Sequence, residues 1–265
     1  MAFSSFCRPC TSFPSRIRKS KKKALNEVKG LYKLFTKFGV PSGAKVLDFS
    51  CGIGNHSIPL SNMGYSVVGY DPSSPYLKIA EQRLNESSKK EIKNVRFIQG
   101  DPYHSSDILI RNKETNFDAI IIMDNSFGYL GESKDISMLQ NLFKVANRRC
   151  VLILETENRD WRLANFEPIT FFESDHNEML AEWKFNFETS VSEGLIRFYE
   201  RDSFNDGYLK LSLKLPMLIR LYSLHELKDL ISKAGWSYKE SYDDIVPLKP
   251  FTNGNMSIFS VSTTY

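Results

Sequence analysis

Apolar and polar positions along this chain predict a series of alternating strands and helices. Short apolar runs predict strands at 45–49, 66–70, 94–99, 118–123 and 150–155. Between them, apolar residues recur with helical spacing at 54–63, 74–87, 104–112 and 133–147. A first helix is predicted over 24–38 and ends before Pro41 and Gly43. Strands and helices that alternate in this way imply parallel βαβ units with right-handed crossovers.

The pattern changes after Asn158 and becomes strand-like, with a period of two. Between 168 and 219, apolar residues such as Trp183, Phe185 and Phe187 alternate with polar ones. Asp206-Gly207 is a strong hairpin-turn signal within this stretch. We expect three or four antiparallel strands here, inserted after the fifth strand of the core.

Helical spacing returns after Ser223, a predicted N-cap that Glu226 would complete as a capping box, and stops at Gly235. Strands near 236–242 and 256–263 would then complete the main sheet. The expected organisation is a leader at 1–23, an α/β domain made of 24–160 and 220–265, and a strand-rich insert or cap at 161–219.

Composition adds a basic leader to this picture of an ordinary globular chain. The chain has 265 residues, of which 42% are hydrophobic and 25% charged, and no apolar run is long enough for a membrane span or a signal peptide. Seven of the 35 basic residues precede Glu27 with no acid among them, so the remaining 28 face 31 acids, a balance of −3. Such a leader could contact RNA or an anionic membrane surface, resemble a transit peptide, or be a solvated entry to the first helix.

The four cysteines predict a reducing, cytoplasmic location and no metal site. Cys51 lies in a turn and Cys150 beside a core strand, as expected for free thiols. Cys7 and Cys10 form a C-x-x-C pair, but no second pair or nearby histidine completes a zinc set. We expect a mobile thiol pair there.

The candidate chemistry lies where the first two strands end. The first strand runs through Asp48 into a turn with Gly52 and Gly54, and the second ends at Asp71. Glycines let the backbone approach a nucleoside-containing ligand, and an acid after the second strand can bind a ribose diol. The third glycine of a dinucleotide fingerprint is replaced by Ser57, and the carboxylate of Asp48 suits an amino group better than a pyrophosphate.

The stretch from Val46 to His56 therefore resembles the first motif of the class I S-adenosylmethionine-dependent methyltransferases. Two further strand ends are similar to that family: Asp101 after 94–100, where relatives contact the adenine, and Asp124-Asn125-Ser126-Phe127 at the methyl-transfer site. Residues 145–150 depart from the Pro-Gly-Gly turn of many relatives. The resemblance implies a Rossmann-like, seven-stranded sheet with helices on both faces and an antiparallel insert.

The resemblance also implies which residues bind S-adenosylmethionine. The cofactor-binding set is Asp48, Ser50, Gly52, Gly54, Asn55, His56, Asp71, Pro72, Ser73, Asp101, Pro102, Asp124 and Asn125. Relatives often have an arginine in the leader near the cofactor, which directs attention to Arg16 and Arg18. Tyr129, Trp161 and Arg162 are expected to face the methyl acceptor.

For several of these residues a structural role is an open alternative. Asp71 and Asp101 could each cap a helix; His56 could only pack; Trp161 and Arg162 could join the insert to the core. No general base is assigned, although His176, His225, Asp124 and Tyr129 are candidates.

The leading expectation is an enzyme that methylates an oxygen or nitrogen of a small molecule. The insert would fold over the carboxyl ends of the core strands and close an aromatic pocket against Asp124, Phe127 and Tyr129. Nucleic acid is a possible but less favoured partner. The alternatives are an RNA or protein methyltransferase that uses the leader and an inert cofactor-binding module. A nicotinamide oxidoreductase is least favoured. The acceptor and the oligomeric state are not indicated by the sequence.

Overall fold

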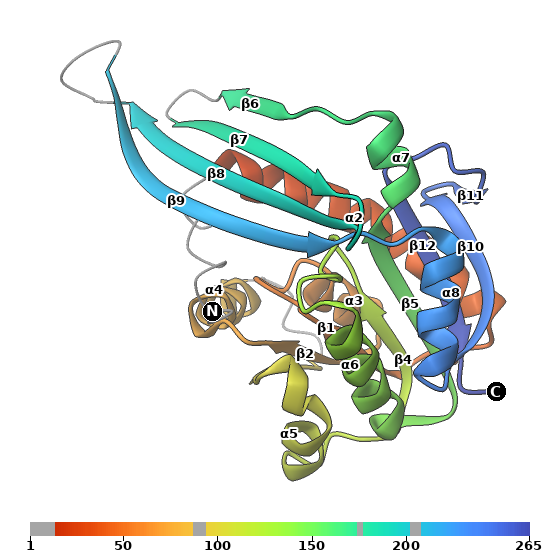
Figure 1. The fold of residues 1–265 in the computed structure, drawn as a ribbon. Helices are drawn as coiled ribbons and strands as arrows, with labels where there is room; N and C mark the ends of the chain where they lie inside the picture. Colours follow the sequence, from red (N-terminus) through yellow and green to blue (C-terminus); the bar gives the residue numbers. More distant parts are fainter. Residues whose placement is uncertain (1–13, 87–93, 174–176, 202–207) are drawn as a thin grey trace.

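A computed structural model of the chain shows one large sheet with helices on both faces and a second, smaller sheet beside it (Figure 1). It describes residues 14–86, 94–173, 177–201 and 208–265, and only the backbone of 14–21. The large sheet has the strand order β11-β10-β12-β5-β4-β1-β2-β3. Its strands are β1 (Lys45–Phe49), β2 (Ser66–Asp71), β3 (Val95–Gln99), β4 (Phe117–Ile122), β5 (Ala146–Glu157), β10 (Ser237–Ile245), β11 (Leu248–Pro250) and β12 (Ser257–Thr263).

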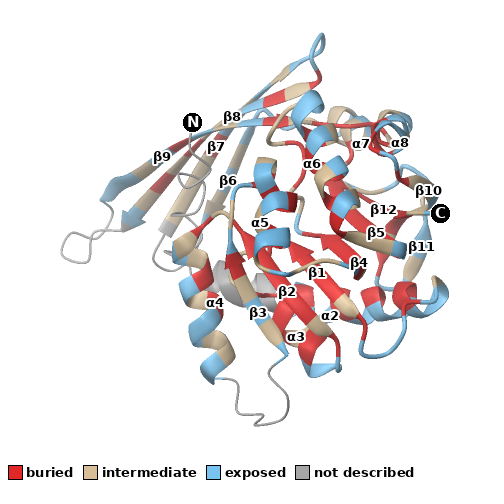
Figure 2. Ribbon diagram, turned by 90° about the horizontal axis from the view of Figure 1, so that it is seen from below, coloured by how far each residue is buried: buried red, intermediate tan, exposed pale blue. Residues whose placement is uncertain are grey.

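Helices cover this sheet in two layers, each with its own apolar cluster. The helices are α2 (Pro14–Lys37), α3 (Ser57–Asn62), α4 (Ser74–Glu86), α5 (Ser105–Arg111), α6 (Glu132–Val145), α7 (Arg159–Ala164) and α8 (Leu224–Lys233), with a short η2 (Pro102–His104). One cluster joins α5, α6 and α8 to the sheet, and the other joins α2 and α3 to its opposite face. Because both faces are covered, the central strands are buried along nearly their whole length, as Figure 2 shows, and most of their buried residues are apolar.

The order of the parallel strands determines where a ligand can bind. β1 pairs with β2 on one side and with β4 on the other, and all three run parallel. The strand order therefore reverses between β1 and β4, and in open α/β sheets ligands bind outside the carboxyl ends of the strands at such a point. Asp48, Asp71 and Asp124 lie at or next to these ends.

The insert forms a four-stranded antiparallel sheet with the order β6-β7-β8-β9. Its strands are β6 (Ile169–Glu173), β7 (Asn177–Asn186), β8 (Val191–Arg201) and β9 (Leu209–Arg220). The insert leaves the core after β5 and returns at Tyr222, which pairs with Asn158. A second attachment is the hydrogen bond that the Arg220 amide donates to the Gly128 carbonyl in the loop after β4, at 2.8 Å. The insert is thus attached at the carboxyl edge of the sheet, and Figure 1 shows α2 running beneath its strands.

The strand and helix order predicted from the sequence is confirmed, with differences at four places. The first helix, α2, begins at Pro14 rather than at 24, so it takes in the last ten residues of the expected leader at 1–23, whose lysines and arginines are good helix formers. Helix α3 begins at Ser57 rather than at 54, because residues 52–56 form turns that follow left-handed residues in the glycine segment. β5 extends from 146 to 157, taking over the end of the expected helix 133–147. A short eighth strand, β11, is added at the sheet edge beyond the seven expected. The capping box of Ser223 and Glu226 is confirmed.

Some sequence expectations fall on residues outside the described part of the chain. These are the Asp206-Gly207 turn, His176, and the Cys7 and Cys10 pair. Among the described residues, no helix is both long and apolar enough to cross a membrane.

Candidate cofactor and methyl-transfer site

The turn after β1 has the backbone that the glycine motif predicts. Gly52 and Gly54 have φ of +54° and +75°, a region that glycine adopts without steric cost. A Cβ on Gly54 would lie 3.1 Å from the ring of Phe97, whereas one on Gly52 would meet only a ring carbon of Tyr76, at 4.0 Å. The turn therefore packs tightly on one side and leaves space beside Gly52. Ser50 shares the left-handed conformation, at +63°.

Asp71 is held at the end of β2 by two backbone amides. Gly52 N–H donates to Oδ2 and Ser73 N–H to Oδ1, each at 2.8 Å. The side chain does not cap α4, because the amide of Tyr76 in its first turn pairs with the Ser73 hydroxyl. A carboxylate has about four acceptor positions, so two remain for other donors. Burial raises the pKa of Asp71 to about 6, although the two backbone donors oppose the shift.

Asp48 and His56 belong to a buried polar group beneath the turn. The Ser57 hydroxyl donates to Asp48 at 2.5 Å, and His56 Nε2 lies 2.9 Å from a carboxylate oxygen of Glu27 on α2. Burial alone would lower the pKa of His56, but its bond to Glu27 and the nearby carboxylates raise it overall. Burial raises the pKa of Asp48. His56 therefore links α2 to the glycine turn, which favours the packing alternative.

A lysine on α2 lies among three carboxylates at the same edge. Lys23 Nζ is 3.0 Å from Glu27, 3.1 Å from Asp124 and 3.3 Å from Glu155. The Asp124 amide also donates to Glu155 at 2.7 Å. Burial alone would lower the pKa of Lys23, but the three carboxylates raise it above its usual value. The same carboxylates have a spacing that could hold a metal ion, but the ammonium group lies between them.

Asp124 and Asn125 form a strained turn after β4. Both are left-handed, with φ of +56° and +52°, and non-glycine residues rarely adopt this conformation without a local reason. The Asn125 Oδ1 atom is buried and has no hydrogen-bond partner in the described part of the chain. The unpaired Oδ1 atom of Asn125 and the two open acceptor positions on Asp71 suit a ligand with several hydrogen-bond donors. A ribose that carries an amino acid tail is such a ligand.

The carboxylate at the third strand end caps a short helix and is otherwise exposed. Asp101 accepts from the Tyr103 amide at 2.8 Å and caps η2, and its carbonyl accepts from the Tyr70 hydroxyl at 2.7 Å. The capping alternative for Asp101 is therefore seen, and any contact with adenine stays a prediction. Pro102 is buried behind this turn.

Asn55 also has a structural partner, because its Oδ1 accepts from Arg83 at 2.8 Å. Pro72 and Ser73 continue the turn that fixes Asp71.

The residues expected to face the acceptor separate into two groups. Tyr129 is half-buried in the loop after β4. Arg162 forms an ion pair with Glu157 at the end of β5, and its guanidinium lies 5.7 Å from the ring centroid of Trp183 in the insert. That is the alternative in which this segment joins the insert to the core. Phe127 is buried against Tyr222 and belongs to the core.

Sequence reasoning did not identify Lys23, Glu27 or Glu155, although each carries a signal. Glu155 ends an apolar strand as Asp48 does, and Glu27 interrupts the apolar face of the first helix. Lys23 is four residues before Glu27, one helical turn away, and is the last residue of the expected leader at 1–23. Only the tertiary contact between α2 and two strand ends brings them together.

Comparison with known proteins agrees with this geometry. Residues 46–149 match a family described as a methyltransferase domain. A glycine/sarcosine N-methyltransferase of Halorhodospira halochloris is 32% identical over 166 residues, which are 62% of this chain and 56% of that protein. A putative methyltransferase, YqeM, of Bacillus subtilis is 26% identical over 146 residues, 55% of each chain. The chain thus spans about half the length of these relatives.

Solved structures share the fold. A methyltransferase of Clostridium acetobutylicum, described as S-adenosylmethionine-dependent, has a TM-score of 0.73 at 15% identity and covers 90% of both chains. The amino pentose methyltransferase CalS10 of Micromonospora echinaspora, solved with bound S-adenosylmethionine, has a TM-score of 0.64 at 16% identity over 91% of this chain and 92% of its own. Likeness at this identity shows the fold alone.

Proposed function

Because this chain belongs to the class I S-adenosylmethionine-dependent methyltransferases, we propose that it transfers a methyl group to an oxygen or nitrogen of a small molecule. The observation that carries the proposal is Asp71, a buried carboxylate fixed by two backbone amides beside the glycine turn. Its remaining acceptor positions suit the two hydroxyls of a ribose, and such charge-assisted bonds are strong. S-adenosylmethionine, the cofactor of the family, supplies an electrophilic methyl group on a sulfonium when bound.

We expect different residues around the turn to bind different parts of this cofactor. Asp71 would bind the ribose, while Gly52 leaves its backbone open to the ligand. The Asn125 side chain would accept a donor from the amino acid end. In-line displacement of the methyl group mainly requires that the acceptor atom be aligned with the methyl group and that water be excluded. Rigid placement of these groups by strand ends and by α2 therefore accounts for most of what the protein must do.

The position of the insert supports a small acceptor. It is attached at the carboxyl edge through the Asn158–Tyr222 pair and the Gly128–Arg220 bond, on the edge of the sheet where Asp124 lies, and we infer that it limits the approach of a large substrate. A covered site admits a small molecule more readily than a polymer. One curated relative is named for methylation of glycine and sarcosine, and one structural relative for an amino pentose. The two buried free thiols, Cys51 and Cys150, support a reducing, cytoplasmic location.

Transfer of a labelled methyl group tests this proposal. The full chain is incubated with methyl-labelled S-adenosylmethionine and, separately, a metabolite extract, an RNA pool and a protein pool. The proposal expects label in the low-mass fraction of the metabolite sample. Label found only in RNA or in protein would instead favour a polymer substrate and a role for the basic leader.

Variants at the expected acceptor side give a finer prediction. Tyr129→Ala and Trp161→Ala should each impair turnover while the affinity for S-adenosylhomocysteine stays within a few-fold. The reason is that Tyr129 follows β4 and Trp161 lies in α7 after β5, whereas Asp71 ends β2. Turnover assays measure the first effect and calorimetry with S-adenosylhomocysteine measures the second. Equal losses in turnover and in cofactor affinity would place these residues at the cofactor.

A further inference from the structure

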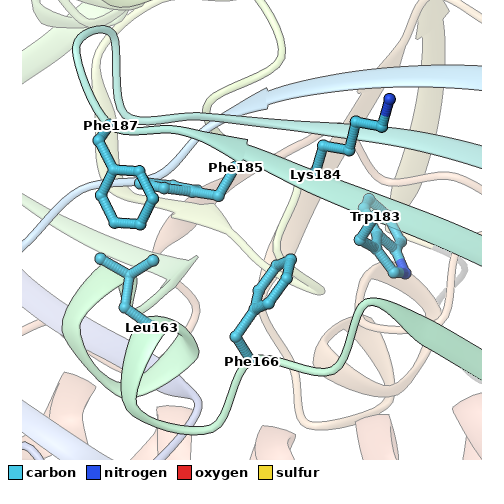
Figure 3. A pocket seen from close by; sticks show the side chains of 6 residues that line it. All are labelled: Leu163, Phe166, Trp183, Lys184, Phe185 and Phe187. Carbon is cyan, nitrogen blue, oxygen red and sulfur yellow. The ribbon is translucent and has the colours of Figure 1, made fainter.

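The insert and α7 form an aromatic cavity, open to solvent on one side, that the proposed function has not used. Its volume is about 370 Å³. Figure 3 shows the rings of Phe166, Phe185 and Phe187 turned toward a common space, while the ammonium group of Lys184 points away from it. Phe187 is 78% exposed, so the cavity is open to solvent on this side. The lining residues are Leu163, Phe166, Trp183, Lys184, Phe185 and Phe187.

The Trp183 wall of this cavity is fixed from three sides. Its Nε1–H donates to the Thr170 hydroxyl at 3.4 Å. The guanidinium of Arg162 lies over its ring. Gly194 on the neighbouring strand β8 lies opposite Trp183, and a Cβ on Gly194 would be 2.4 Å from a carbon of the Trp183 ring. The ring can occupy this place only because residue 194 has no side chain, so the cavity has a preformed wall.

A series of side-chain contacts connects the Trp183 wall of this cavity to the strand ends near Asp124. Arg162, which stacks on Trp183, is ion-paired with Glu157 on β5. Glu155 lies two residues earlier on the same strand and accepts from the Asp124 amide. Side chains two residues apart on a strand point to the same face and lie roughly 6.6 Å apart. The Trp183 wall is therefore only a few contacts away from Asp124.

We propose that this cavity binds the apolar ring portion of the methyl acceptor. This assignment rests on the proposed function. A cavity of about 150 Å³ is sufficient for benzene, so 370 Å³ admits a body of about two fused rings. The walls are aromatic, and the guanidinium of Arg162 is engaged by Glu157, so the cavity selects a flat, uncharged ring system. The reactive oxygen or nitrogen of such an acceptor would extend past Glu157 toward Asp124.

Binding of 2-naphthol, a two-ring probe, tests the proposal. Ligand-observed NMR on the full chain should show binding that weakens about tenfold in Phe166→Ala, which removes one ring of the cavity. Gly194→Ala should also weaken it, because the new methyl group displaces the Trp183 ring. Phe171→Ala is the matched control, since Phe171 is an exposed aromatic residue on β6 that does not line the cavity. Failure of 2-naphthol to bind, or equal binding by all variants, overturns the proposal.

Two companion measurements separate this proposal from the proposed function. Calorimetry with S-adenosylhomocysteine should give the same affinity in wild type, Phe166→Ala and Gly194→Ala, so a failure of the cavity would leave cofactor binding intact. In the labelled-extract assay, 2-naphthol should inhibit methyl transfer competitively with the acceptor. If it binds at the cavity without inhibiting transfer, the cavity is a separate site and the assignment to the acceptor is wrong.

Discussion

At the scale of single residues, the site contains several carboxylates, and different groups balance their charges: backbone amides in one case and a lysine in others. Asp71 was identified from its place after the second strand, since a strand-end acid needs only local sequence to be recognised. Lys23 and Glu27 were not identified, because a helix far from these strands in the sequence brings them to the site. Burial of Glu155 raises its pKa, and Lys23 opposes that shift. The charge balance at this edge is therefore a tertiary property.

Loss of the Asp71 side chain should weaken cofactor binding. Asp71→Ala removes two charge-assisted bonds, and a loss of about 1.5–3 kcal/mol corresponds to roughly 10- to 150-fold in affinity for S-adenosylhomocysteine. Calorimetry measures this directly. Unchanged affinity would show that Asp71 does not bind the ribose.

The raised pKa of Asp71 predicts a pH dependence of the same affinity. The ionised carboxylate is the better acceptor for hydroxyl donors, and its pKa is about 6. Affinity for S-adenosylhomocysteine should therefore be full above that pH and fall as the pH is lowered through it. Asp71→Asn should bind more weakly and lose this step, and a step that persists in the variant would belong to another group.

Removal of the Lys23 charge should destabilise the fold through Glu155. Lys23→Met leaves a buried carboxylate without its cation, at a cost of roughly 1–3 kcal/mol in the free energy of unfolding. Adding Glu155→Gln should recover part of that loss, because the amide still accepts from the Asp124 backbone. Urea unfolding of the single and double variants measures the coupling, with Lys22→Met as an exposed control. Additive effects in the double variant would mean that the pair is not coupled.

At the scale of elements, periodicity predicted the type and order of the strands and helices, and local turn geometry set their ends. Helix 54–63 was expected too early, because residues 52–56 form turns, with Gly52 and Gly54 left-handed, that no apolar period reveals. β5 was expected too short, because Ala146 pairs with Phe117 of β4 while the polar residues at 147–149 that follow it break the apolar pattern. Strand β11 has only three residues and carries too little pattern to recognise.

The junction between insert and core gives a prediction at this scale. Gly128 has a φ of +94°, and a Cβ there would lie 2.3 Å from the Arg220 carbonyl oxygen. Gly128→Ala should therefore lose both backbone freedom and the bond that attaches β9. Gly131→Ala is the matched control, because it has a φ of +81° but nothing within 4 Å.

The control should cost about 1–2 kcal/mol from backbone strain alone. Gly128→Ala should cost about 1–3 kcal/mol more from the clash, and it should expose residues around 158 and 222 to limited proteolysis. Equal losses in the two variants would mean that this contact does not hold the insert in place.

At the scale of the whole molecule, the sequence predicted the parallel core, its antiparallel edge and the separate inserted sheet. It did so because each element buries its own apolar pattern on a fixed period. The aromatic cavity was not predicted: the expected pocket lay against Phe127, which is instead buried under Tyr222, while the cavity found lies between α7 and β7. Packing between two inserted elements has no signature in the sequence of either.

Methyl transfer by this protein requires that the carboxyl edge of the sheet bind S-adenosylmethionine and not a dinucleotide. The most direct test is one calorimetric comparison, in which the full chain is titrated with S-adenosylhomocysteine and, separately, with NAD. The glycine turn without a third glycine, the buried Asp48 and the Asp71 carboxylate predict binding of S-adenosylhomocysteine at one site per chain and no heat of binding with NAD. Binding of NAD, or the absence of binding by S-adenosylhomocysteine, would contradict the assignment of this site.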